Sequence, residues 1–336
     1  MSSPSAALRA LPNHPKSIGT RMLLSDIETP LIILVGPTAV GKTALSIELA
    51  QRLSAEIISS DSRLFYRGMD IGTAKPTLQE RSLVPHHLID VADPHESWSL
   101  ALFQQTAYQI IDDIHARGRL PLMVGGTGQY VHAITHGWRM PAQAPDDSLR
   151  EVLNRWAQHI GAERLHQKLA LLDPAAAANI DWRNQRRTVR ALEVIFHTGK
   201  RFSAQRREGK PRYPTLQIGL WLPREEIFRR VDERIEAMFT QGFVEEVRGL
   251  VAAGYSPDMP GMASIGYREV CAHLRGEMTL EEVKARMRQL THQFVRRQAN
   301  WFKQDDPAIQ WFDVRQPAII PVILDTIQTT GHWRLP

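Results

Sequence analysis

The residues best suited to chemistry lie together at positions 36–43, which read GPTAVGKT and fit the pattern G-x-x-x-x-G-K-[ST]. An apolar run from Leu31 to Val35 precedes them and predicts a buried strand, and residues 44–53 predict a helix. Glycines allow several backbone N–H groups to converge on one anion, and a helix N-terminus adds partial positive charge. We therefore predict a polyphosphate-binding loop made of Gly36, Pro37, Thr38, Ala39, Val40, Gly41, Lys42 and Thr43.

Two side chains of this loop have distinct expected roles. Lys42 supplies a mobile cation for phosphate oxygens, and the Thr43 hydroxyl can hold Mg²⁺. Three chemistries fit such a loop: a GTPase, a small-molecule kinase that uses ATP, and a transferase that binds the diphosphate of an allylic donor as its leaving group. Guanine selectivity usually comes with an N-K-x-D element, and the chain contains no Asn-Lys pair. A GTPase is therefore disfavoured.

Two further candidate side chains follow predicted strands. Residues 55–61 predict a second strand that carries Asp61 at its carboxyl end, and residues 120–124 predict a strand that runs into the glycine cluster around Thr127. In open α/β sheets, ligands lie at the carboxyl ends of the strands. We therefore expect Asp61 to face the same crevice as the phosphate loop.

The order of the predicted elements indicates the fold. Strands and helices alternate up to about residue 133, which predicts an α/β, P-loop NTPase-like fold with a doubly wound parallel sheet. Residues 149–202 have a helical pattern, and residues 213–222 predict a strand that returns to the sheet. The expected organisation is a disordered tail over 1–29, a core over 30–138 and 213–312, a helical insertion over 139–212, and a C-terminal tail over 313–336.

Composition narrows the class of protein. The chain has 336 residues, and 43% of them are apolar, which suffices for a full core. The single cysteine, Cys271, excludes a disulfide framework and suits a reducing compartment. No apolar run approaches the roughly 18 residues that a membrane span needs. We expect a cytoplasmic monomer with no membrane partner.

The net charge of +5 is unevenly distributed. Residues 183–212 include ten basic side chains and only two acidic ones, Glu193 and Glu208. The predicted helix 281–303 carries six more basic residues. One interpretation of such a basic run is a helix face that is exposed to solvent. Two basic surfaces away from the phosphate loop also suit an RNA backbone, and the sequence favours this second interpretation.

Several blocks, in order between residues 31 and 303, resemble the tRNA dimethylallyltransferase family. They are GPTAVGKTALSIELA, SSDSRLFYRGMDIGTAKP, HHLIDVADPHESWSLALFQ, VGGTGQYVHA, QRRTVRALEV, ASIGYREV and THQFVRRQANWF. The resemblance covers most of the chain. It implies transfer of a dimethylallyl group from dimethylallyl diphosphate to the exocyclic amine of the adenine 3′ of the anticodon, with Mg²⁺ as cofactor and the tRNA anticodon stem-loop as partner.

The resemblance also implies roles for individual residues. Asp61 is the candidate general base, Thr127 contacts the substrate, and Lys42 with either Arg230 or Arg234 binds the diphosphate. Helix-surface ion pairing with Glu226 or Glu233 is the alternative role for either arginine. The implied tRNA contacts are Asp61, Ser62, Arg63, Leu64, Thr127, Arg150, Gln185, Arg186, Arg187, Thr188, Val189, Ile265, Gly266, Tyr267 and Arg268.

The chain departs from the family pattern at two positions of interest. Leu64 stands where family members commonly carry Gln, so a hydrogen bond to the adenine edge is in doubt, and His292 replaces a common Arg at an expected RNA contact. Three other functions stay open: prenylation of a free adenine nucleotide, phosphoryl transfer by a small-molecule kinase, and RNA binding without catalysis. The basic insertion favours tRNA, because a free nucleotide does not need it.

Overall fold

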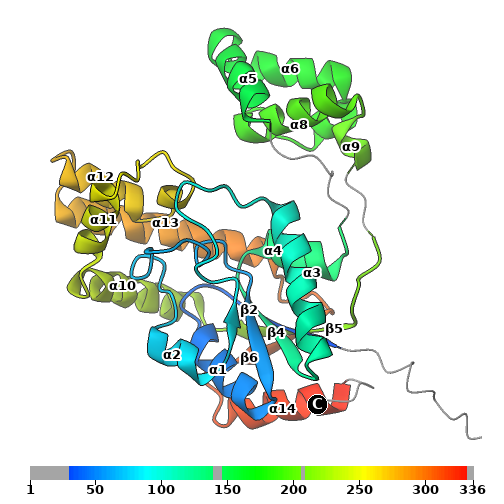
Figure 1. Cartoon of the computed structure of the whole chain (residues 1–336), viewed down its shortest axis with the longest axis vertical. Helices are drawn as coiled ribbons and strands as arrows, with labels where there is room; N and C mark the ends of the chain where they lie inside the picture. Colours follow the sequence, from blue (N-terminus) through cyan, green and yellow to red (C-terminus); the bar gives the residue numbers. More distant parts are fainter. Residues whose placement is uncertain (1–29, 139–145, 206–208, 331–336) are drawn as a thin grey trace, which may run out of the picture.

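The computed structural model describes residues 30–138, 146–205 and 209–330. The predicted tail over 1–29 lies outside these residues. Within them, six parallel strands form one sheet in the order β3-β2-β4-β1-β5-β6 (Figure 1). The strands are β1 (Leu31–Val35), β2 (Ala55–Ser59), β3 (His86–His87), β4 (Leu120–Gly125), β5 (Thr215–Trp221) and β6 (Ile309–Asp313). The predicted parallel α/β sheet is confirmed.

Strand β1 lies at the centre of the hydrophobic core. All five of its side chains are fully buried, because β1 pairs with β4 and β5 at its edges and helices cover its faces. Helices α1 (Lys42–Arg52) and α3 (Leu100–Ala116) flank the strands in Figure 1, and α4 (Gly128–Thr135) packs beside α3. The apolar run that predicted this strand therefore forms a fully buried interior strand of the sheet.

The register of three neighbouring strands brings their carboxyl ends to one level. Val35 of β1 pairs with Gly125 of β4, and Ser59 of β2 pairs with Val124 of β4. The phosphate loop, the segment with Asp61 and the segment with Thr127 follow these strands directly. The sheet therefore places the three candidate segments side by side, as the sequence predicted for Asp61.

A second hydrophobic core lies within the predicted insertion. Its buried residues, among them Leu165, Leu169 and Leu192, come only from helices of this unit and the turns between them. The unit stands apart from the sheet in Figure 1. It comprises α5 (Asp147–Ile160), α6 (Ala162–Leu172), α7 (Pro174–Ala178), α8 (Gln185–Thr198) and α9 (Phe202–Gln205).

Between β5 and β6 the chain is helical, as predicted for residues 224–303. Helix α10 (Arg224–Thr240) packs along the long helix α13 (Leu280–Trp301), and both contribute to the main core. The short helices α2 (Leu78–Leu83), α11 (Phe243–Ala252) and α12 (Tyr267–Leu274) and a 3₁₀ turn (Gly261–Ala263) complete this part. Among the described helices, none is both long and apolar enough to cross a membrane.

The C-terminal segment differs from the expected tail over 313–336. Asp313 ends strand β6, and helix α14 (Ile319–Thr330) follows and packs against α1. Ile323 and Ile327 are fully buried on the main core. The apolar spacing of this helix therefore belongs to the fold and extends the core past residue 312.

We predict that Ile323→Ala lowers the free energy of unfolding by about 2–4 kcal/mol, because it leaves a cavity between α14 and the sheet. The neighbouring Val322 is 45% exposed, so Val322→Ala should change stability by only about 0.5 kcal/mol. Urea unfolding followed by circular dichroism measures both. Equal, small effects would show that α14 does not contribute to the core.

Candidate active site

The phosphate loop has the backbone of an anion-binding turn. Ala39 and Gly41 have φ angles of 65° and 105°, so the backbone turns through left-handed conformations twice before α1 begins. At Gly36, a Cβ atom would lie 2.6 Å from the carbonyl oxygen of Leu220. The first amide groups of α1 have no partner within the helix by position. They are therefore available to an anion at the N-terminus of α1.

A buried side chain from α13 connects this loop to the glycine cluster. The Oε1 atom of Gln298 accepts the N–H of Thr38 at 2.9 Å, and its Nε2 donates to the carbonyl of Gly126 at 3.1 Å. Gln298 is 4% exposed. The bond occupies the Thr38 amide, which we expected to face phosphate, and leaves the later amides of the loop for that role. The RRQANWF block contains this glutamine, but the sequence alone did not reveal its partners.

Lys42 lies close to two other charged side chains of the site, Asp61 and Arg234. Its Nζ donates to the carbonyl oxygens of Gly36 and Pro37 at 2.9 and 2.8 Å. Burial lowers the pKa of Lys42 to about 8, the charge of Asp61 acts against this shift, and the charge of Arg234 adds to it. Asp61 and Arg234 are therefore close enough to act on the ammonium group.

Asp61 presents one carboxylate oxygen without a hydrogen bond among the described residues. Its Oδ1 accepts the N–H of Arg63 at 3.0 Å, and its own N–H donates to the Ser59 hydroxyl at 3.2 Å. These bonds hold the carboxylate at the end of β2, where it is partly buried. Oδ2 is available to accept a proton or a hydrogen bond from a ligand.

Thr127 is equally available. It is the residue before α4, but its hydroxyl does not cap that helix and makes no hydrogen bond within the described residues. The flanking glycines are tightly packed, since a Cβ on Gly126 or Gly128 would lie 2.2 Å from the side chain of Gln298 or Trp301 respectively. The backbone is thus fixed while the hydroxyl stays free for a substrate.

The structure distinguishes the two candidate arginines. Arg230 forms an ion pair with Glu226 at 2.7 Å along α10, whereas no described carboxylate lies within ion-pair distance of Arg234. Burial lowers the pKa of Arg234. Arg234 lines a small cavity in front of the phosphate loop, together with Thr38, Arg63, Gly72, Thr73, Ala74, Val231, Ile235, Met238, Ile265, Met287 and Thr291. Geometry therefore favours Arg234 as the diphosphate ligand.

This front cavity combines two kinds of surface. Its polar lining residues are Thr38, Arg63, Thr73, Arg234 and Thr291, and its apolar ones include Met238 and Met287. The guanidinium of Arg63, another lining residue, stacks on the ring of Phe294 with 4.3 Å to the centroid, and burial lowers the pKa of Arg63. The cavity measures about 40 Å³ and brings the buried Arg234 close to Thr38 of the phosphate loop.

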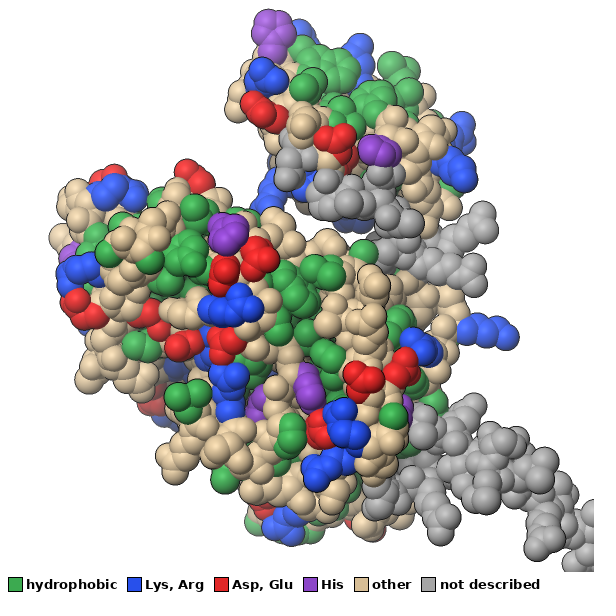
Figure 2. Space-filling view, viewed as in Figure 1, with side chains coloured by type: hydrophobic (Ala, Val, Ile, Leu, Met, Phe, Trp, Pro, Cys, Tyr) green, Lys and Arg blue, Asp and Glu red, His purple; other side chains and the backbone are tan. Residues whose placement is uncertain are grey.

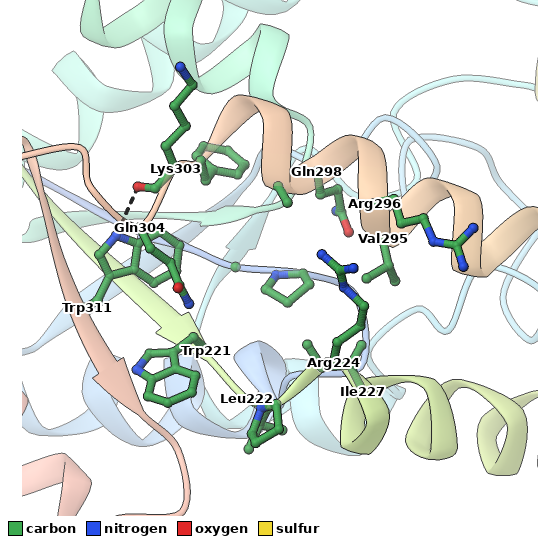
Figure 3. A pocket seen from close by; sticks show the side chains of 15 residues that line it. Trp221, Leu222, Arg224, Ile227, Val295, Arg296, Gln298, Lys303, Gln304 and Trp311 are labelled. Atoms are coloured by element: carbon green, nitrogen blue, oxygen red, sulfur yellow. Dashed lines mark hydrogen bonds between the residues drawn. The ribbon is translucent and has the colours of Figure 1, made fainter.

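A larger cavity of about 600 Å³ has Gln298 in its wall. Gly36 and Pro37 border it, and it extends between β5, α10 and α13 (Figure 3). Figure 3 shows Arg224 reaching into this space, while Arg296 points away from it. Its lining is mostly apolar, with aromatic walls from Trp221, Trp311 and Phe302.

The expected tRNA contacts in the insertion divide into two groups. Arg186 and Arg187 are exposed in the first turn of α8, next to the half-buried Gln185. The side chains of Thr188 and Val189 are buried at 0% and 4% exposure, so they pack inside the unit and cannot present themselves to RNA. Helical periodicity is the reason, because these two positions face the second core.

Arg150 is also tied into that unit. Its Nε donates to Glu193 at 2.9 Å, and Glu193 additionally pairs with Arg190 and accepts the N–H of Asp146. Because Glu193 is fully buried, these bonds fix the start of α5 on α8. An RNA contact by Arg150 would be added to this structural role.

The remaining expected contacts lie in the segments around residues 62–64 and 265–268, of which Arg63 and Ile265 line the front cavity. Ser62 and Leu64 are partly buried in the segment after Asp61, and the half-buried Ile265 lines the cavity. Tyr267 is fully buried and donates its hydroxyl to Glu246, so it supports the site from behind and does not reach RNA.

Three further positions complete this region. The backbone of Gly266 is buried at a φ angle of 99°, and Arg268 is exposed, with its Nε bonded to the Pro257 carbonyl. His292, the departure on α13, bonds Asp232 at 2.9 Å and stacks on Phe228. His292 therefore joins α13 to α10 instead of facing RNA.

The described residues contain no cluster of three or more His, Cys, Asp or Glu side chains that would hold a metal ion. Thr43 lies in the first turn of α1 with a partly buried side chain. A lone hydroxyl beside a phosphate site does suit Mg²⁺, which usually keeps several waters and binds through few protein ligands plus substrate phosphates.

Comparison with known proteins adds an independent finding. The family model described as IPP transferase matches residues 64–305, and the model described as isopentenyl transferase matches residues 29–85. A tRNA dimethylallyltransferase of Roseiflexus sp. is 53% identical over 82% of this chain and 90% of the relative, and one of Thermomicrobium roseum is 48% identical over 86% and 87%.

Solved structures agree with these matches. The tRNA isopentenylpyrophosphate transferase of Bacillus halodurans superposes with a TM-score of 0.67 at 40% identity, covering 90% of this chain and 96% of that one. A eukaryotic dimethylallyltransferase acting on tRNA gives a TM-score of 0.77 at 27% identity, covering 91% and 81%.

We predict that Arg234→Gln weakens the binding of inorganic pyrophosphate by about tenfold or more, because it removes a charged hydrogen-bond donor from the front cavity. Arg230→Gln, on the same helix, should stay within about twofold of the wild type, since its partner is Glu226. Isothermal titration calorimetry in the presence of Mg²⁺ gives both values. The reverse ranking would assign the diphosphate to Arg230.

We also predict a pH dependence of pyrophosphate affinity. With a Lys42 pKa of about 8, the free protein loses this positive charge as pH rises through 8, and binding must then take up a proton. Affinity relative to Lys42→Met should fall by up to about tenfold per pH unit above pH 8. The Lys42→Met comparison cancels the titration of pyrophosphate itself. A constant ratio between pH 7 and 9.5 would contradict the assignment.

Proposed function

Because the chain belongs to the IPP transferase family, we propose that it transfers a dimethylallyl group from dimethylallyl diphosphate to the exocyclic amine of the adenine 3′ of the anticodon in tRNA. One observation carries the proposal: the phosphate loop, the free carboxylate oxygen of Asp61 and the free hydroxyl of Thr127 meet at the ends of three adjacent strands. An anionic donor and an acceptor amine can therefore meet between them.

The reaction needs strong stabilisation of the leaving group. The lone pair of an adenine amine is delocalised into the ring, so the amine is a weak nucleophile. An allylic carbon tolerates positive charge, and the departing diphosphate gains negative charge as its C–O bond breaks. Lys42, Arg234 and the first amides of α1 offer positive charge at this point. Neutralising the diphosphate is thus the main catalytic contribution of this chain.

Asp61 is proposed as the general base. As the bond from nitrogen to the allylic carbon forms, the amine must lose one proton, and Oδ2 of Asp61 accepts it. Diphosphate leaves with the electron pair of the broken C–O bond. Thr127 would orient the adenine by a hydrogen bond from the end of the neighbouring strand β4. The adenine must leave its stack to enter this site, which costs least for an unpaired loop base.

Mg²⁺ is part of the proposal. Thr43 would hold the ion through its hydroxyl, with diphosphate oxygens and waters as the other ligands. Bound there, the ion would supply additional positive charge to the leaving group. The proton transfer to Asp61 does not depend on it.

The insertion supports tRNA as the acceptor. Arg186 and Arg187 are exposed at the N-terminus of α8, where the helix dipole also favours phosphate. Figure 2 shows an open notch between this unit and the helices α11 and α12 of the core. We propose that an anticodon stem-loop lies against both parts, and that the enzyme acts as a monomer in the cytoplasm.

Labelled donor tests this function against its rivals. The purified protein is incubated with dimethylallyl diphosphate carrying label in the alkyl group, Mg²⁺, and either unmodified tRNA or AMP. We expect label in tRNA. Label in AMP alone would indicate prenylation of the free nucleotide, and label in neither acceptor would favour a kinase or a non-catalytic RNA-binding protein.

In the same assay, we predict that Asp61→Ala lowers turnover on tRNA by about 100-fold or more, since it removes the carboxylate proposed to accept the amine proton. Its affinity for tRNA, measured by filter binding, should stay close to that of the wild type. Loss of both to the same extent would make Asp61 a structural residue. Glu245→Ala, an exposed substitution on α11, is a control for the general effect of mutation.

A further inference from the structure

One large aromatic side chain at the end of α13 stays at the surface beside the site. Trp301 is 38% exposed, whereas the next residue, Phe302, is 4% exposed and packs in the main core. The end of the helix therefore buries one ring and leaves part of the other open to a ligand.

The indole of Trp301 lies directly on the segment that carries Thr127. A Cβ atom at Gly128 would lie 2.2 Å from Cγ and 2.3 Å from Cβ of Trp301, so only a glycine permits this approach. About one helical turn earlier, Gln298 donates to the Gly126 carbonyl at 3.1 Å. Helix α13 thus contacts the residue on each side of Thr127, and the partly exposed indole adjoins the position that is proposed to orient the adenine.

The covered part of the indole is held in place. The backbone at Gly128 supports it, and the ring of His132 meets it edge to face at 83° with 5.2 Å between centroids. An aromatic side chain that is already ordered loses little conformational entropy when a ligand binds to its open surface. This arrangement suits stacking against a flat group.

Basic side chains lie on both sides of Trp301 in α13 and the turn after it. Arg297 precedes it by about one helical turn and Lys303 follows it by two residues; both are exposed, and neither forms an ion pair among the described residues. Figure 3 shows Lys303 pointing away from the large cavity. Burial lowers the pKa of Arg63, and the charge of Arg297 adds to this shift, so Arg297 also lies near the segment after Asp61. The charge around the indole complements a phosphate backbone.

We propose that Trp301 is a stacking platform for the anticodon-loop base next to the target adenine. The inference rests on the proposed function, in which Asp61 and Thr127 receive the target adenine itself. When that adenine leaves its stack, the neighbouring base loses a stacking partner. The open surface of the indole replaces this partner and recovers part of the cost of flipping. Stacking tolerates any base, so Trp301 contributes affinity for an unpaired loop without selecting its sequence.

The test compares Trp301→Phe with Trp301→Leu. Phenylalanine keeps a flat ring over Gly128, whereas leucine keeps apolar bulk and has no ring. We expect affinity for unmodified tRNA, measured by filter binding, to stay within about threefold of the wild type in Trp301→Phe and to fall about tenfold or more in Trp301→Leu. Affinity for inorganic pyrophosphate, from titration calorimetry with Mg²⁺, should stay within about twofold in both. Leu171→Ala, at a position 79% exposed on α6, should match the wild type in both measurements.

Two altered tRNAs, which lack the base 5′ or 3′ of the target adenine, identify the stacked base. The wild type should lose about tenfold in affinity for one of them. Trp301→Leu should lose nothing further with that tRNA, because both changes remove the same contact. Independent, additive losses with both altered tRNAs would overturn the inference.

A purely structural role for Trp301 gives a different result. Equal losses of tRNA affinity in Trp301→Phe and Trp301→Leu, or a parallel loss of pyrophosphate affinity, would show that the indole only packs on Gly128. If Trp301→Leu does not fold, Trp301→Met takes its place in each comparison. The wild-type reaction with dimethylallyl diphosphate and unmodified tRNA is read first. Its failure would overturn the proposed function, whereas failure of the binding comparisons alone would overturn only the role of Trp301.

Discussion

The site depends on one buried amide. Gln298 of α13 binds the Thr38 amide with its oxygen and the Gly126 carbonyl with its nitrogen. These two groups belong to segments that follow the adjacent strands β1 and β4. A buried amide side chain with both ends satisfied has one favoured orientation, because rotation would place donor against donor and acceptor against acceptor. The spacing between the phosphate loop and the segment with Thr127 is fixed in this way.

Two positively charged side chains, Lys42 and Arg234, lie beside the phosphate loop. Lys42 and Arg234 lie near each other, and burial lowers the pKa of both side chains. The Lys42 ammonium group and the Arg234 guanidinium group are therefore both poorly solvated in the free protein. Arg230, in contrast, is compensated by its ion pair with Glu226. Two poorly solvated cations, neither of which forms an ion pair with a carboxylate of the described residues, form a site that a diphosphate would stabilise. The surrounding apolar walls strengthen this interaction by excluding water.

Sequence patterns identified what depends on local chemistry. The strand, glycine loop and helix at residues 31–53, and the position of Asp61 at a strand end, follow from periodicity and turn residues. Contacts between distant segments were not accessible: Gln298 and Thr38 are 260 positions apart, and Glu246 and Ile71 are 175 apart. The burial of Tyr267, Thr188 and Val189 likewise depends on which helix face meets a neighbour. Helix α14 was not predicted, because its apolar face becomes part of the core only through packing against α1, which the sequence does not show.

The central claim is that the phosphate loop holds a departing diphosphate while an alkyl group changes hands. The most direct measurement uses dimethylallyl diphosphate labelled with ¹⁴C in the alkyl group and with ³²P in the diphosphate. After one turnover with unmodified tRNA, the account predicts ¹⁴C in the tRNA and all ³²P in free pyrophosphate. Transfer of ³²P to the acceptor, or release of monophosphate together with unmodified tRNA, would contradict it.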